Sequence, residues 1–206
     1  MNTIKAICLD LDGVYFTDAG KRSFNEKLAE HGLSPEQIKE FHWSVEMKGL
    51  VRGTVSSEEF LVFVNKTLGT EFSMIEFEDM WADGYRVDED VKSVVQRARE
   101  LGYLACVCTS NNAVRLSALE KKFGFSQDFD CFISSNQVGE TKPSSIIFQK
   151  LIDCTGVAPE EIVYADDNPE RLSGASELGI KTFAYTTFPT FITELENLGV
   201  VNLTSD

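Results

Sequence analysis

The feature that most constrains the fold of this chain is a regular alternation of short apolar runs with amphipathic segments. Five runs have the length and composition of buried strands, at residues 4–10, 103–109, 129–133, 161–165 and 180–184. Before each of the last four, apolar residues recur with helical spacing, over about 88–101, 111–123, 143–154 and 168–179. Such an alternation predicts βαβ units and hence an α/β fold, with an open parallel sheet covered by helices on both faces.

Residues 18–87 interrupt this alternation. They contain no convincing strand pattern, and helical spacing covers about 21–31, 35–48, 57–68 and 71–82. Ser34 and Ser56 each stand before an acidic or amide-containing turn, as helix-capping serines do. We therefore predict two domains: an α/β core of residues 1–17 and 88–206, and an inserted α-helical cap domain of residues 18–87. The expected linkers are 15–20 and 84–88.

The charge of the chain limits its partners. With 33 acidic and 19 basic side chains among 206 residues, the formal net charge is −14. A protein of this charge is not expected to bind nucleic acid, which normally requires a basic surface. A small phosphorylated ligand remains compatible with it, provided that a few cations or a metal ion reverse the field locally.

The sequence also bears on cellular location. The apolar run before Asp10 is shorter than that of a signal peptide, and no uncharged stretch approaches the ~20 residues that span a bilayer. Of the five cysteines, Cys8, Cys106 and Cys108 fall inside predicted strands, and no CxxC pair occurs. We therefore predict reduced, buried thiols and a cytoplasmic protein with no membrane partner.

Polar side chains follow four of the predicted strands. In chain order they are Asp10, Asp12, Thr109, Ser110, Lys142, Asp166 and Asp167. In an open parallel sheet, ligands bind at the carboxyl ends of the strands, so these side chains are expected to converge. Taken singly, each has an ordinary explanation, since a strand-end Asp commonly forms a turn and a loop lysine is commonly solvated.

Their convergence changes that interpretation. Carboxylates brought together in one crevice repel each other strongly unless a cation lies among them. Hard oxygen ligands without a His or Cys favour Mg²⁺ over zinc or copper. Lys142 and Thr109 would then hold an anionic group, for which phosphate is the natural candidate.

These residues resemble the four ordered motifs of the haloacid dehalogenase-like hydrolase superfamily. The motifs correspond to the run 10–14 (DLDGV), Thr109, Lys142 with Pro143, and Asp166 with Asp167. The stretch 161–179 also resembles the last motif of the helical-capped subfamily I, the branch of phosphatases and β-phosphoglucomutases. The resemblance implies a Rossmann-like core, an inserted helical cap, a Mg²⁺ cofactor and a phosphoric monoester hydrolase acting on a small phosphorylated metabolite.

The resemblance also implies a role for each residue. Asp10 would be the nucleophile that forms an aspartyl-phosphate, and Asp12 the general acid and base. The metal would be held by Asp10, the backbone carbonyl of Asp12, Asp166 and Asp167. The substrate phosphate would be bound by Thr109, Ser110 and Lys142.

Three other functions remain open at this point. Haloacid dehalogenases lack the second acid of the first motif, so Asp12 favours a phosphatase. The related β-phosphoglucomutases carry a Thr-x-x-x-His pair where this chain has Asp18 and Arg22, which counts against a mutase. A non-catalytic, receiver-like protein would place its acidic pair differently and would need no cap-sized insert.

Substrate selection is expected to lie in the insert. Its most ligand-like residues are His42, Trp43, Lys48 and Arg52, of which His42 and Arg52 are the candidate substrate contacts. Each also has a structural explanation: core packing for Trp43, as for Trp81, and a satisfied or solvated polar group for the others. From the last motif, Arg171 is expected either to approach the site or to pair with a nearby acid. The sequence names neither a particular metabolite nor an oligomeric state.

Overall fold

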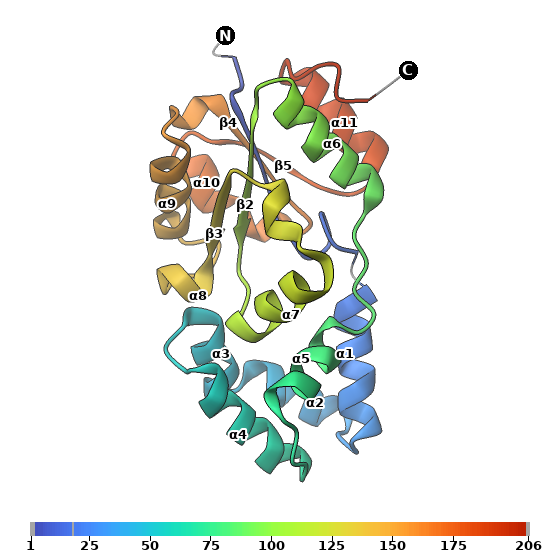
Figure 1. Ribbon diagram of the computed structural model, residues 1–206. Helices are drawn as coiled ribbons and strands as arrows, with labels where there is room; N and C mark the ends of the chain where they lie inside the picture. Colours follow the sequence, from blue (N-terminus) through green and yellow to red (C-terminus); the bar gives the residue numbers. More distant parts are fainter. Residues whose placement is uncertain (1–2, 18, 205–206) are drawn as a thin grey trace.

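The computed structural model describes residues 3–17 and 19–204. Its five strands form one sheet in which every neighbouring pair is parallel, in the order β3-β2-β1-β4-β5 (Figure 1). The strands are β1 Ala6–Leu9, β2 Leu104–Thr109, β3 Cys131–Ser134, β4 Ile162–Asp166 and β5 Lys181–Ala184. The strand order reverses on the two sides of β1, which makes its carboxyl end the point where α/β sheets bind ligands. The predicted α/β, Rossmann-like class is confirmed.

Helices cover both faces of the sheet, because successive strand residues point to opposite sides. On one face, Ile7 and Leu9 pack with α6 (Glu89–Glu100) and α11 (Phe188–Asn197). On the other face, Ala6 and Cys8 pack with α9 (Ser145–Thr155) and α10 (Ser173–Glu177). Figure 1 shows these two helical layers on either side of the strands. The three central strands are therefore almost wholly buried, and polar groups that could act on a ligand lie at the strand ends.

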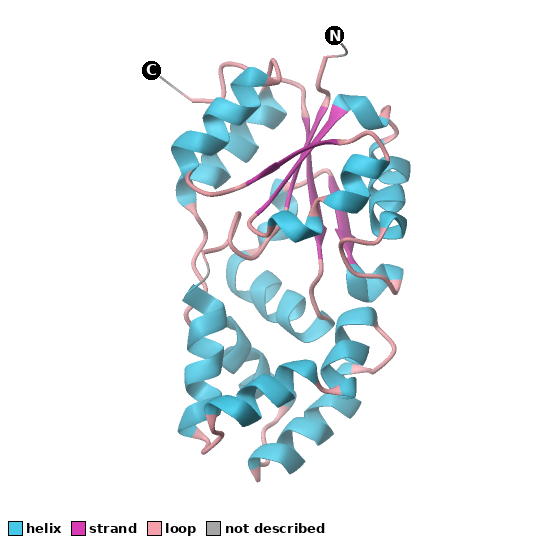
Figure 2. Cartoon of the chain, turned by 180° about the vertical axis from the view of Figure 1, so that it is seen from behind, coloured by secondary structure: helices cyan, strands magenta, loops and turns pink. Residues whose placement is uncertain are grey.

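Five helices form a separate group, here called the helical unit, beyond the carboxyl end of the sheet (Figures 1 and 2). They are α1 Ala19–Glu30, α2 Pro35–Trp43, α3 Val45–Arg52, α4 Ser57–Leu68 and α5 Met74–Ala82. An aromatic cluster fills the interior, where the rings of Phe24 and Trp81 stack with centroids 3.6 Å apart. The division into domains at 17/18 and 87/88 stays a prediction. Asp18, one of the two residues compared with the mutases, lies outside the described residues.

One helix predicted in this region is in fact two. The pattern over 35–48 reads as continuous, but Ser44 ends α2 and its hydroxyl accepts a hydrogen bond from the Met47 amide at the start of α3. A serine whose side chain caps the next helix adopts an extended backbone, which stops the preceding helix. The predicted capping serines Ser34 and Ser56 each form a capping box, as does Ser73.

The helical unit contacts the rest of the chain on two sides of the sheet's carboxyl end. On one side, Val114 and Ala118 of α7 (Ala113–Phe123) are buried in the hydrophobic cluster of the helical unit. Glu78 of α5 accepts hydrogen bonds there from Lys121 and from Ser117, the latter at 2.7 Å. On the other side, the Ser135 hydroxyl of α8 (Ser135–Val138) donates to the backbone oxygen of Val51 at 2.7 Å. The helical unit is thereby held over the ends of the strands.

Two helices after the insert differ from their predicted extents. The helix expected from Pro143 begins at Ser145, because Ser144 accepts the Ile146 amide and acts as the N-cap. The helix expected over 168–179 is a 3-10 turn, Pro169–Arg171, followed by the five-residue α10. The turn closes with short-range bonds such as Arg171 N–H to the Asn168 oxygen, so an α-helix does not start until Ser173.

The prediction of wholly reduced cysteines is wrong for one pair. Cys131 of β3 and Cys154 of α9 form a disulfide, with Cα atoms 6.1 Å apart. The packing of α9 against β3 brings these positions within the normal disulfide range, although 23 residues separate them in the sequence. Cys8, Cys106 and Cys108 are free and buried, as predicted. Among the described residues, no helix has the length and apolarity that a bilayer crossing requires.

Candidate active site

A buried cluster of three charges lies at the centre of the carboxyl edge. Asp10 follows β1, Asp166 ends β4, and the Lys142 ammonium reaches both from the loop after α8. Its Nζ lies 3.0 Å from Asp10 Oδ1 and 2.5 Å from Asp166 Oδ2. All three side chains are almost completely buried, with at most 1% of each exposed. Charges buried this deeply are tolerated only when paired, so the three groups depend on one another.

The pKa values reflect this interdependence. Burial alone would lower the pKa of Lys142, but the carboxylates of Asp10 and Asp166 outweigh burial and raise it above its usual value. Burial would likewise raise the pKa of Asp166, but the charge and hydrogen bonds of its neighbours hold it below the usual range. Those neighbours are Lys142 and Tyr164, whose hydroxyl lies 2.5 Å from Asp166 Oδ2 and 2.7 Å from Lys142 Nζ. Lys142 and Asp166 are therefore both charged at neutral pH.

Asp167 extends the acidic cluster towards solvent. Carboxylate oxygens of Asp10, Asp166 and Asp167 all lie within 4.8 Å of one another, and Asp167 is exposed. Burial and repulsion by Asp10 and Asp166 raise the pKa of Asp167, although Lys21 opposes the shift. Gly13 makes room for this side chain, since a Cβ at Gly13 would lie 2.4 Å from Asp167 Oδ2. Three convergent carboxylates with an open side are a donor set that fits Mg²⁺.

The end of β2 supplies the hydroxyl groups. Thr109 is buried as the last residue of β2, which pairs with β1, the strand that leads to Asp10. Ser110 follows it, and its Oγ accepts a hydrogen bond of 2.9 Å from the backbone N–H of Lys142. Ser110 thus orients the loop that carries Lys142. The predicted role of both hydroxyls in binding phosphate stays a prediction.

Asp12 has a cationic partner that the sequence analysis missed. Arg115 Nη1 lies 2.6 Å from Asp12 Oδ2, and the guanidinium stacks on Trp81 of the helical unit, 4.3 Å from the ring centroid. The Asn112 side chain accepts the Arg115 amide and caps α7, which fixes Arg115 in the first turn at the sheet's carboxyl end. An asparagine directly before the helical pattern that follows the Thr109 strand is the sequence signal that could have placed Arg115 near the site.

Arg171 does both things that the sequence left as alternatives. It approaches the site, and the acid with which it pairs is Asp10, at 3.4 Å between Nη1 and Oδ2. Burial disfavours its charge, but the carboxylates of Asp10, Asp166 and Asp167 together raise the pKa of Arg171.

The candidate residues of the insert line two hollows, and His42 contributes to both. His42 is half-buried and its Nε2 lies 2.7 Å from Asn25 Oδ1, in a small cavity that Arg115 also lines. Arg52 and Lys48 are exposed and line the second hollow together with His42 and Thr141. The prediction that Trp43 belongs to the core is wrong, because its side chain is 65% exposed and lies against the Lys48 ammonium instead. Trp81 is fully buried, as predicted.

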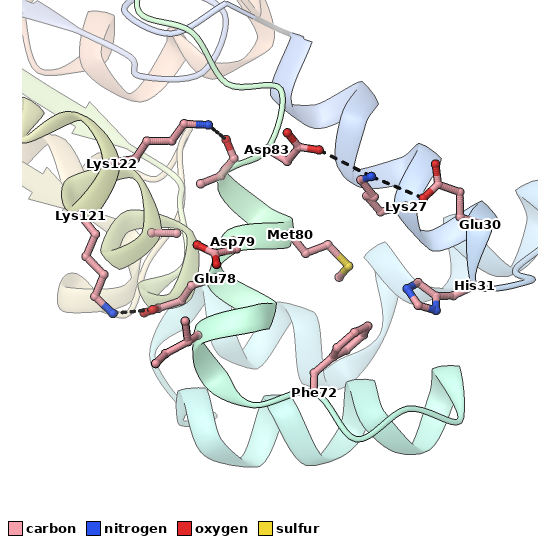
Figure 3. Close-up of a pocket in the computed structure, with 13 residues that line it drawn as sticks. Lys27, Glu30, His31, Phe72, Glu78, Asp79, Met80, Asp83, Lys121 and Lys122 are labelled. Atoms are coloured by element: carbon pink, nitrogen blue, oxygen red, sulfur yellow. Dashed lines mark hydrogen bonds and ion pairs between the residues drawn. The ribbon is translucent and has the colours of Figure 1, made fainter.

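A larger hollow of about 950 Å³ lies away from these residues, between α1, α5 and α7 (Figure 3). Its lining includes several mutually paired charges, such as Lys121 with Glu78 and Lys27 with Glu30. None of the predicted site residues lines it. This hollow is therefore separate from the carboxylate cluster.

The family model of the haloacid dehalogenase-like hydrolases matches residues 4–179, which include every strand-end residue described above. The chain belongs to the haloacid dehalogenase-like hydrolases. The resemblance seen in the sequence motifs is thereby confirmed, and the protein is a hydrolase.

Individual members of the family show how widely the likeness extends. Over 189 residues the chain is 25% identical to D-ribitol-5-phosphate phosphatase of Bacteroides thetaiotaomicron, covering 87% of this chain and 91% of that enzyme. It is 24% identical to Bifunctional epoxide hydrolase 2 of Sus scrofa over 97% of its own length, but spans only 40% of that protein.

Solved structures share the fold of this hydrolase. A HAD family enzyme from Bacteroides thetaiotaomicron, solved as a magnesium complex, superimposes with a TM-score of 0.77 at 20% identity. The match covers 90% of this chain and 94% of that enzyme.

Proposed function

We propose that this hydrolase is a Mg²⁺-dependent phosphatase that acts on a small phosphorylated metabolite through an aspartyl-phosphate on Asp10. The observation that supports this most directly is the convergence of carboxylate oxygens of Asp10, Asp166 and Asp167 within 4.8 Å of one another, with Lys142 buried beside them. Phosphoryl transfer depends mainly on positioning and on neutralising charge, and this arrangement supplies both.

In the first step, a carboxylate oxygen of Asp10 attacks phosphorus and the bond from phosphorus to the leaving oxygen breaks. Asp12 gives its proton to that oxygen. In the second step Asp12 takes a proton from water, whose oxygen attacks phosphorus, and the bond to Asp10 breaks to release phosphate. The two residues follow one another at alternate positions after β1, so one strand end positions both the nucleophile and the acid.

The remaining strand-end residues bind and neutralise. Asp10, Asp166, Asp167 and the backbone carbonyl of Asp12 would hold the metal, which when bound neutralises charge on the transferred phosphoryl group. Thr109 and Ser110 would donate hydrogen bonds to phosphoryl oxygens. Lys142, 3.0 Å from Asp10, would offset the negative charge that accumulates in the transition state.

The proposal also covers the substrate class and the cellular location. A small phosphorylated metabolite is the substrate class, which is supported by a related enzyme named for D-ribitol 5-phosphate. The cytoplasmic location expected from the sequence stays a prediction, as does the division into core and cap domains.

The test is a screen for phosphate release from sugar, polyol, nucleotide and carboxylate monophosphates, with Mg²⁺ and with EDTA. We expect free phosphate from at least one compound, only with Mg²⁺, and none from the Asp10→Asn variant. An isomeric phosphate as the product would indicate a mutase, and halide from a 2-haloacid would indicate a dehalogenase. Metal-independent turnover, or full turnover by Asp10→Asn, would contradict the proposal.

A further inference from the structure

We propose that the small cavity beside Asp12 binds a negatively charged group, a carboxylate or a second phosphate, on the leaving half of the substrate. This inference rests on the proposed function and adds a substrate class to it. The cavity is lined by Lys21, Phe24, Asn25, His42, Trp81 and Arg115, from helices α1, α2, α5 and α7.

The position of the cavity follows from Asp12. As the general acid, Asp12 must lie beside the leaving oxygen, and the rest of the leaving group must therefore extend past Asp12. Arg115 pairs with Asp12 at 2.6 Å and also lines the cavity, so it joins the two places. A leaving group bound here would contact both the sheet's edge, through Arg115, and the helical unit, through Trp81 and His42.

Two residues that line the cavity carry hydrogen-bond donors that have no partner. Arg115 Nε and Trp81 Nε1 are both buried without a hydrogen-bond partner. Buried donors left unpaired cost free energy, so an acceptor on a ligand is what the two groups require. Neither N–H can accept a hydrogen bond, so a group that offers only donors would not satisfy them.

The charges point the same way. Arg115 remains charged, because Tyr85, Asp12 and Asp10 raise its pKa although burial opposes the charge. Lys21 supplies a second cation, and among the described lining residues no side chain is acidic. Burial lowers the pKa of His42, and Arg115 lowers it further, so the imidazole is neutral and donates from Nε2 to Asn25. Arg115 shares its charge with Asp12, so Lys21 is the lining cation that makes the cavity favour an anion over a neutral polyol.

The size of the cavity limits the leaving group. Its volume of about 260 Å³ lies below the ~300–1,000 Å³ of sites for drug-sized ligands. The stacked rings of Phe24 and Trp81 close one side, and neither ring can move without disturbing the interior of the helical unit. A chain of a few carbons that ends in a carboxylate or a phosphate matches this space.

The test compares three-carbon substrates that differ in the charge of the leaving group. Glycerol 3-phosphate carries a neutral leaving group, glycerate 3-phosphate a carboxylate, and glycerol 1,3-bisphosphate a second phosphate. We expect kcat/KM to be at least about tenfold higher for one or both of the charged compounds, as charge-assisted hydrogen bonds imply. A higher kcat/KM for glycerate 3-phosphate would indicate that the cavity binds a carboxylate, and a higher kcat/KM for glycerol 1,3-bisphosphate that it binds a second phosphate.

Variants tie the preference to the cavity. Lys21→Gln should reduce the ratio of kcat/KM between charged and neutral substrates by about tenfold, whereas Lys27→Gln, further along the same helix, should leave the ratio unchanged. An equal or higher kcat/KM for glycerol 3-phosphate, or an undiminished preference in Lys21→Gln, would overturn the inference while leaving the phosphatase intact. A failure to release phosphate from any compound in the broad screen would instead overturn the proposed function, and this inference with it.

Discussion

Replacing Lys142 by Met tests whether the charge cluster holds the site together. Met has a similar length but no charge, so the substitution leaves Asp10 and Asp166 buried without the ammonium that lies 3.0 and 2.5 Å from them. Removing one partner of a buried ion pair typically costs about 3–5 kcal/mol, because the remaining charge is uncompensated. Since two carboxylates lose the same partner here, we expect a loss of about 4 kcal/mol in the free energy of unfolding at pH 7.

The pH dependence of this loss is also fixed by the site. In the native protein the pKa of Asp166 is lowered, so its ionisation stabilises the fold at neutral pH, and this contribution disappears as pH falls through the folded-state pKa. In the variant, the buried Asp166 carboxylate without its ammonium partner is destabilising when ionised and can be protonated as pH falls. The difference between the two proteins should therefore be largest near pH 7 and shrink towards pH 4.

The assay is urea unfolding with EDTA present, followed by circular dichroism at both pH values. Lys150→Met is the matched control, because Lys150 forms an exposed ion pair with Asp153, a kind of pair that contributes no more than about 1 kcal/mol. Adding Asp166→Asn to the Lys142→Met variant should restore part of the lost stability, since it removes one unpaired carboxylate. A loss below about 1 kcal/mol for Lys142→Met, or a loss that grows towards pH 4, would refute the reasoning.

Three further predictions concern the general acid, the metal site and the stability of the charge cluster. Asp12→Asn should lower kcat for an alkyl phosphate by about 10²–10⁴-fold. It should lower kcat for p-nitrophenyl phosphate much less, because the p-nitrophenolate leaving group needs little protonation. Equal losses of kcat for the two substrates in steady-state assays would contradict the acid role. Gly13→Ala should displace Asp167 and raise the half-saturating Mg²⁺ concentration by about 10–100-fold, whereas Gly102→Ala, at a similar positive φ but in open space, should not. Tyr164→Phe should destabilise the protein by about 1–3 kcal/mol in the same urea assay, because Lys142 and Asp166 lose a buried partner; an unchanged midpoint would show that the hydroxyl contributes nothing.

The fold was largely predictable from the sequence because its signals are local. Strand runs ending in polar residues and capping serines such as Ser56 act within a few residues of themselves, and both predictions are confirmed. The helix over 35–48 was misjudged because Ser44 fits either the interior of one helix or the cap between two. Only the packing around it decides between these possibilities.

The convergence of the site was predictable for a different reason. Parallel strands end at one edge of the sheet, so residues that follow them, such as Asp10 and Asp166, meet whatever separates them in sequence. Contacts made through packing alone were not accessible. Arg115 bridges Asp12 and Trp81, and Cys131 meets Cys154, only because particular helices lie against particular partners.

The central claim is that Asp10 carries the phosphoryl group during turnover, and trapping that species tests it most directly. The enzyme would be mixed with a substrate found in the screen and Mg²⁺, quenched in acid within milliseconds, digested and analysed by peptide mass spectrometry. The account predicts a phosphorylated peptide containing Asp10 that forms and decays within one turnover and is absent from the Asp10→Asn variant. Phosphate release at full rate with no phosphorylated Asp10 at any time, or with the phosphoryl group on another residue, would contradict it.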